Sequence, residues 1–141
     1  MSAMSTYLEN ALVNFVLRNN PDTFASPGTT VYVGLIEYYD AAVVEAGTLT
    51  QEVTGNGYTR IQVDGGSTDG WVAAINGATS NEGAITFPTA TGDWNGISGV
   101  IISDHATAGN VLLHGALTTA RDVKSGDVFK FNAGDLDVTF A

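Results

Sequence analysis

The chain has 141 residues, of which 44% are apolar and only 14% are charged, and its formal net charge is −10 at pH 7. This length and apolar content predict a single domain over residues 1–141 with a core of its own. The five basic residues are scattered, which argues against direct binding of nucleic acid or of an anionic membrane surface. No apolar run approaches the ~18–20 residues of a membrane-spanning helix. The absence of cysteine excludes disulfides and thiolate metal sites.

The N-terminal segment has the pattern of one amphipathic helix, from about residue 6 to residue 18. Thr6 and Glu9 have the spacing of a capping box, which predicts Thr6 as the N-cap. Arg18 would lie in the last turn, where its charge suits the helix dipole. The sequence Asn19-Asn20-Pro21 would end the helix.

The apolar residues of this helix recur at positions i, i+3, i+4, i+7 and i+8, so they form one stripe. Three of them, Leu8, Leu12 and Phe15, are the candidate contact residues of the helix. We expect them to pack on the edge or end of a sheet, or on a neighbouring subunit.

Everything after Pro27 is predicted to form short strands separated by turns. The predicted strands are 31–36, 58–63, 71–75, 84–87, 99–103, 111–117, 127–131 and 135–140. Asn-Gly pairs at 56–57, 76–77 and 95–96 suit turns that need positive φ. Eight short strands and a single helix predict a mainly β fold, a single antiparallel β-sandwich or flattened barrel. The chain has no heptads and no internal repeat, so it carries no fibrous stalk.

The strand pattern also predicts where particular side chains lie. Alternation over residues 58–63 would place Tyr58, Arg60 and Gln62 on one face of a strand. Between the strands 84–87 and 99–103, Trp94 would plug the open end of the sandwich, dry on one side and wet on the other. Trp94 is therefore the fourth candidate contact residue.

The two histidines are candidates for catalysis or metal binding, but a structural role explains both better. Asp104 precedes His105, and sequence neighbours on a strand point to opposite faces. His114 is expected on the less buried face of its strand, and no spacing brings the two imidazoles together. We therefore predict no catalytic residue, no metal ligand and no cofactor, and the protein is not expected to be an enzyme.

Three further groups of residues are candidate sites. The segment Asp64–Gly70 resembles a calcium loop but lacks its ligand order, and a solvated hairpin loop explains it better. Asp135 and Asp137 would share one strand face, either as half of an acid–base pair or as the wet face of an edge strand. Trp71 and Trp94 could line a sugar platform, although structural roles are preferred.

The chain contains, in order, TYLENALVNFVLRN, PGTTVYVGLIEYYD, EVTGNGYTRIQV, NEGAITFPTATGDW and GNVLLHGALTTARDVKSGDVFKFNAGDLDVTF. These stretches resemble a family of short tailed-phage virion proteins that is labelled phage tail fibre protein or minor capsid protein. The resemblance runs from about residue 6 to residue 140. It implies a structural component of the virion, assembled in the host cytoplasm, with no catalytic residues.

The place of the protein on the particle is inferred from its physics. A compact acidic domain without a shaft fits a capsid decoration or cement protein on the outer surface of the head, bound to the major capsid protein. A homo-oligomer is expected, and a trimer would suit the threefold positions of a capsid lattice. One alternative is a tail fibre, tail-tip or baseplate protein that contacts tail proteins. Another is a carbohydrate-binding β-sandwich for host adhesion, which exposed aromatic residues would support and buried Trp71 and Trp94 would oppose.

Overall fold

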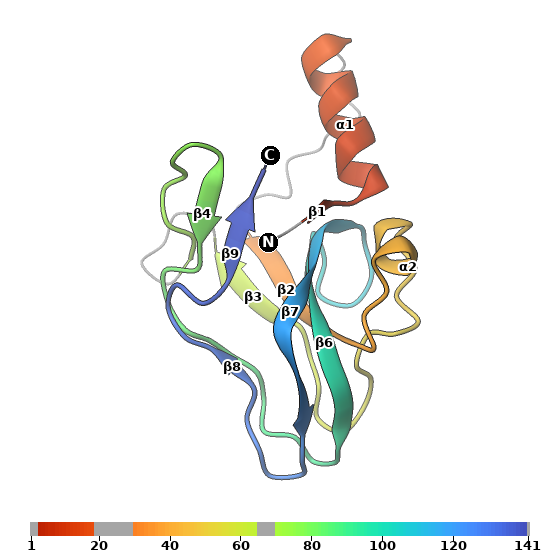
Figure 1. Ribbon diagram of the computed structural model, residues 1–141, viewed down its shortest axis with the longest axis vertical. Coiled ribbons are helices and arrows are strands. Elements are labelled where there is room, and N and C mark those ends of the chain that lie inside the picture. Colours follow the sequence, from red (N-terminus) through yellow and green to blue (C-terminus); the bar gives the residue numbers. More distant parts are fainter. Residues whose placement is uncertain (1–2, 19–29, 65–69, 141) are drawn as a thin grey trace.

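The computed structural model describes residues 3–18, 30–64 and 70–140, and it shows a mainly antiparallel β protein with a helix near the N-terminus (Figure 1). The main sheet has five strands in the order β1-β7-β6-β2-β3. Their bounds are Ala3–Met4 (β1), Thr30–Glu37 (β2), Ile61–Asp64 (β3), Trp94–Ser103 (β6) and Val111–Val123 (β7). The predicted fold class is thereby confirmed.

Two short ladders complete the β structure. Strand β4 (Ala78–Ser80) pairs with β9 (Asp137–Thr139), and β5 (Ile85–Thr86) pairs with β8 (Lys130–Phe131). Both pairs are antiparallel. In Figure 1 the β4–β9 ladder and β8 lie on one side of the main sheet, whereas helix α2 (Ala41–Glu45) lies on the other.

The core is divided by the main sheet because successive residues of a strand point to opposite faces. On β2, Val33 and Leu35 face the ladders, and they share one cluster with Phe87 and Phe131. Ile36 faces the other way and packs in a smaller cluster under α2. Burial on both faces explains why β2 and the middle of β6 are continuous apolar runs in the sequence.

Helix α1 (Thr6–Leu17) begins at the predicted residue, but its N-cap is Ser5 and not Thr6. The Ser5 hydroxyl accepts a hydrogen bond from the backbone N–H of Leu8 at 3.3 Å and donates one to the carbonyl of Val111. The Ser5 backbone N–H donates to the carbonyl of Leu112 at 2.9 Å. Contacts with β7 therefore select Ser5 as the cap, and Thr6 with Glu9 forms no capping box. Helix α2 was not predicted, although Asp40 caps it by accepting from the N–H groups of Ala42 and Val43.

The Asn-Gly predictions are confirmed at two places and wrong at the third. Asn56-Gly57 and Asn76-Gly77 both adopt positive φ at both residues. Asn95-Gly96 is no turn between strands: it lies inside β6, where Gly96 alone has a φ of 60° at a break in the β6–β7 register. The irregular crossing therefore ends before Trp94, which is the first residue of β6.

The predicted strands at 58–63 and 71–75 are corrected. The first is shortened to β3, so Tyr58 and Arg60 precede the strand and Arg60 is buried. The second is absent, because Trp71 and Ile75 form only isolated bridges, to Asn81 and Ala78 respectively. The β6–β7 hairpin is longer than predicted, since β7 continues through the polar residues 118–122.

Candidate functional site

Helix α1 changes from buried to exposed along its length. Leu8 is only 4% exposed and belongs to the main core, and Leu12 is partly buried against it. Phe15, the third predicted contact residue, is 47% exposed. The second half of the helix stands away from the sheets (Figure 1). The predicted stripe therefore packs on the protein's own sheet only at its N-terminal end.

Apolar side chains nevertheless dominate the second half of α1. Its exposed large apolar residues, which we call the distal α1 surface, are Val13, Phe15, Val16 and Leu17. Val16 and Leu17 are 68% and 78% exposed. The only charged residue of α1 is Glu9, in the first turn. An apolar patch of this kind, unprotected by charge, is typical of a surface that binds another protein.

The base of α1 is fixed to the main sheet. Strand β1, just before the helix, pairs with β7 through Ala3 opposite His114 and Met4 opposite Leu113. The hydrogen bonds of Ser5 to Val111 and Leu112 extend this attachment. The distal α1 surface is therefore presented by a helix with an anchored N-terminus. The sequence missed Val13 and Leu17, although apolar residues on every side of the helix from position 12 onward were a usable signal.

Trp94 is not a surface residue. Its side chain is fully buried in the main core, its indole N–H donates to the carbonyl of Asn56 at 3.2 Å, and its ring meets the ring of Tyr58 edge-on at 5.7 Å. The candidate contact residue Trp94 is thus a core residue in the described fold. The polar residues around it gave no sign of this, because the partners that bury it come from distant segments.

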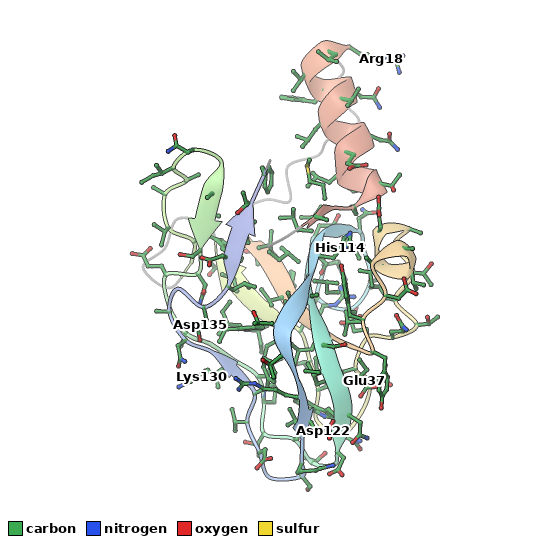
Figure 2. All side chains as sticks on the ribbon, in the orientation of Figure 1. Arg18, Glu37, His114, Asp122, Lys130 and Asp135 are labelled. Atoms are coloured by element: carbon green, nitrogen blue, oxygen red, sulfur yellow. The ribbon has the colours of Figure 1, made fainter. Side chains whose placement is uncertain are left out.

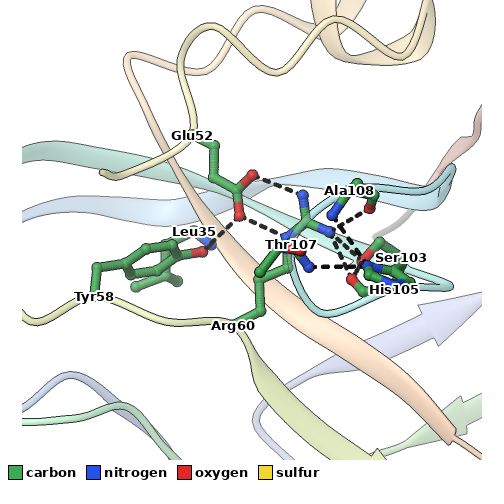
Figure 3. Close-up of polar contacts among 8 residues, drawn as sticks. All are labelled: Leu35, Glu52, Tyr58, Arg60, Ser103, His105, Thr107 and Ala108. Atoms are coloured by element: carbon green, nitrogen blue, oxygen red, sulfur yellow. Dashed lines mark hydrogen bonds and ion pairs between the residues drawn. The ribbon is translucent and has the colours of Figure 1, made fainter. Parts of the chain in front are cut away.

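Arg60 is the centre of a polar cluster that includes Glu52, Tyr58 and Ser103 (Figure 3). Its Nε donates to Oε1 of Glu52 at 2.7 Å, and its Nη2 donates to Oε2 of Glu52 at 2.8 Å. Its Nη1 donates to Oγ of Ser103 and to the carbonyls of His105 and Ala108, at 2.7–2.9 Å. All three guanidinium nitrogens therefore donate to protein groups, and the cluster holds the β6–β7 loop against the segment before β3.

Tyr58 extends this cluster. Its hydroxyl donates to Oε1 of Glu52 at 2.9 Å and accepts from the N–H of Leu35 at 2.9 Å. Burial, and then the neighbouring Glu52 carboxylate, raise the pKa of Tyr58. The hydrogen bond with Glu52 is the main cause that raises the pKa of Arg60. The buried phenol and the hydrogen-bonded ion pair thus have a structural role in this cluster.

His105 and Asp104 do not contact each other as a catalytic pair. The His105 Nδ1 accepts from the N–H groups of Thr107 and Ala108, both at 3.2 Å. The two carboxylate oxygens of Asp104 accept from the backbone and side-chain amides of Asn110, at 2.6 and 2.9 Å. Each side chain thus stabilises the loop between β6 and β7.

His114 contradicts its prediction, because it is only 2% exposed and lies on the face of β7 under α2. Its Nδ1 is 2.6 Å from the hydroxyl of Tyr39. Its Nε2 is buried and has no hydrogen-bond partner among the described residues. Burial lowers the pKa of His114, while the more distant Glu45 and Glu9 oppose that shift. Alternation on an apolar strand could not reveal this burial, because it depends on α2.

The acidic candidates do not converge on one site. Asp135 lies in the turn before β9, where its Oδ2 accepts from the backbone and side-chain amides of Asn132 at 2.8 and 3.0 Å. Asp137 lies on β9 opposite Ser80, so the predicted shared strand face does not exist. Within the segment Asp64–Gly70, residues 65–69 lie outside the described residues, and Asp64 accepts from the hydroxyl of Thr30 at 2.9 Å.

In the described ranges, no three His, Cys, Asp or Glu side chains gather in an arrangement that could hold a metal ion. No helix in those ranges has the length and apolar character needed to cross a membrane.

Comparison with known families gives one match that covers nearly the whole chain. The family described as podophage GP4 fiber I protein gp80 matches residues 3–139. Comparison with curated proteins gives no match. Of the two labels of the phage virion family that the sequence resembles, this match supports the tail fibre label. The chain belongs to the podophage GP4 fiber I protein gp80 family.

Proposed function

We propose that the protein is a non-enzymatic structural subunit of the tail fibre of a tailed phage, attached to its neighbours in the virion through the distal α1 surface. The observation that carries this proposal is the helix itself, which is anchored at its N-terminus and carries Val16 and Leu17 into solvent. Burying such side chains is favourable by about 1.5–3 kcal/mol for each fully covered Val or Leu. The family description supports a fibre rather than a cement protein of the head.

The other two expectations have less support. Capsid decoration was favoured because the chain has no shaft, but a fibre can include compact subunits, and the family description names a fibre. A sugar platform built on tryptophans is disfavoured because Trp94 is fully buried and Trp71 is partly buried. The structural use of Arg60, His105 and Asp135 described above supports the proposal of a non-enzymatic role.

The experiment compares virions assembled with variant subunits. The double variant Val16→Gln with Leu17→Gln removes apolar surface from the distal α1 surface without touching the core. The matched control is Ile75→Gln with Val128→Gln, two exposed apolar residues away from the helix. We expect the amount of the α1 variant in purified virions, measured by quantitative mass spectrometry, to be at least tenfold lower than that of the wild type. We expect the control variant to be retained at the wild-type amount. Retention of both variants would contradict the proposed role of the helix.

Fractionation of disrupted virions tests the location. We expect the protein to sediment with tails. Recovery with tail-free heads would instead support the capsid decoration reading. The homo-oligomer stays a prediction, and light scattering of the purified protein measures it directly.

A further inference from the structure

A polar groove separates the main sheet from the β5–β8 ladder. Strand β7 pairs with β6 along most of its length but with β1 only at Leu113 and His114, and β8 pairs with β5. The register of β7 also breaks between Ala116 and Arg121, where four residues stand opposite Ser98 alone. The resulting β7–β8 groove has a volume of about 310 Å³. Its polar lining consists of Thr118, Thr119, Arg121, Lys130, Asn132 and Asp135.

The two basic side chains that have no hydrogen-bond or ion-pair partner among the described residues both line this groove. Arg60 and Lys124 are held in ion pairs, and Arg18 donates a hydrogen bond within its own helix region. Arg121 and Lys130 make no hydrogen bond or ion pair with any residue of the described ranges, and both line the groove. In a protein with a net charge of −10, these two cations and the single carboxylate of Asp135 leave the groove lining locally positive.

Asp135 indicates what kind of anion would fit. Its Oδ2 is occupied by Asn132, while its Oδ1 has no hydrogen bond within the described residues. A second carboxylate close to this oxygen would be repelled, but a hydroxyl group would donate to it. Figure 2 shows Lys130 and Asp135 along the same side of the molecule, next to β8. The groove therefore combines a cationic part with a part that accepts hydroxyl donors.

We propose that the β7–β8 groove binds an acidic oligosaccharide of the uronic acid type. The guanidinium of Arg121 would receive the carboxylate, because its paired N–H groups match the two carboxylate oxygens. Lys130 adds a second positive charge, and Thr118, Thr119 and Asn132 offer hydrogen bonds to sugar hydroxyls. Asp135 suits a saccharide because each sugar unit brings several hydroxyl donors, and the comparison with triglutamic acid below tests an acidic peptide. Phe129 and Phe131 at the groove are buried. The proposed binding therefore depends on charge and hydrogen bonds and not on aromatic stacking.

The test is an NMR titration of the ¹⁵N-labelled protein with trigalacturonic acid. We expect saturable shifts of the backbone amides of Thr118, Thr119 and Asn132. The double variant Arg121→Gln with Lys130→Gln should weaken binding at least tenfold. The control Lys124→Gln, which removes a cation outside the groove, should change the affinity less than twofold. Thermal melts of all three proteins show whether the fold is retained.

Two comparison ligands separate the possible results. Neutral galactotriose should bind far more weakly than trigalacturonic acid, and equal binding would overturn the role of the cations. Triglutamic acid should also bind more weakly, and equal or tighter binding would make the groove a peptide site. The absence of saturable shifts with trigalacturonic acid would overturn the proposal itself. Virion incorporation of the Arg121 and Lys130 double variant should be normal, so this proposal and the role of α1 succeed or fail separately.

Discussion

Arg60 and Glu52 form a two-pronged ion pair in the interior, with both contacts between guanidinium nitrogen and carboxylate oxygen below 3 Å. The Arg60 side chain is 2% exposed and that of Glu52 is 12% exposed. Through its third nitrogen Arg60 also reaches the β6–β7 loop, so the pair connects the neighbouring residues Glu52 and Arg60 to a loop that is distant along the chain. We regard it as the polar contact on which the loop arrangement most depends.

The first prediction concerns this pair. Glu52→Gln leaves a buried guanidinium without its counter-charge, which typically costs about 3–5 kcal/mol of stability. Urea unfolding measures the loss. The control is Asp93→Asn, which removes the carboxylate of the exposed pair with Lys124 and should cost far less, because solvent screens that pair. Equal losses of stability from the two substitutions would show that the interior pair contributes no more to stability than the exposed pair.

The second prediction concerns the two ends of α1. Leu8→Ala should lower the free energy of unfolding by about 2–5 kcal/mol, because it leaves a cavity in the main core. Leu17→Ala should change it by less than about 0.5 kcal/mol, because that side chain is mostly in solvent. Urea unfolding of the isolated protein measures both. A large loss for Leu17→Ala would mean that the second half of the helix is already covered in solution.

The sequence predicted well those elements that depend on local signals. The apolar runs of β2, β6 and β7 and the two Asn-Gly turns at Gly57 and Gly77 are of this kind. It failed where the partner is distant along the chain. Arg60 was predicted on a polar strand face because alternation cannot foresee that Glu52 and the β6–β7 loop bury it.

The candidate site was predicted in part for the same reason. A helical stripe identifies Leu8 and Leu12 as apolar, but it does not show where the helix leaves the sheet. The exposure of Val16 and Leu17 therefore came only from the structure. The β7–β8 groove could not be found from sequence at all, because Arg121 and Lys130 lie on strands that are not paired with each other.

The third prediction concerns Gly96, the residue that was expected in a turn. Its φ of 60° favours glycine, and an added Cβ would lie 2.4 Å from the ring of Tyr38. Gly96→Ala should therefore be destabilising, by about 1–3 kcal/mol for the left-handed backbone alone. Thermal unfolding measures it. The control is Gly47→Ala, which shares a positive φ but would meet no neighbouring atom, so it should cost less.

The last prediction concerns pH and His114. Burial lowers the pKa of this imidazole in the folded protein, whereas in the unfolded chain it titrates near its ordinary value of about 6.5. The unfolded state then binds more protons below that value, so stability is complete above pH ~6.5 and falls on acidification, by at most about 1.4 kcal/mol per pH unit. Glu45 and Glu9 partly offset the shift but leave its direction unchanged.

Urea unfolding at pH 7.5 and pH 5.5 (about one unit either side of that value) measures this effect. The free energy of unfolding should fall more between the two pH values for the wild type than for His114→Gln. Identical pH dependence in the wild type and His114→Gln would show that the buried imidazole does not couple protonation to folding.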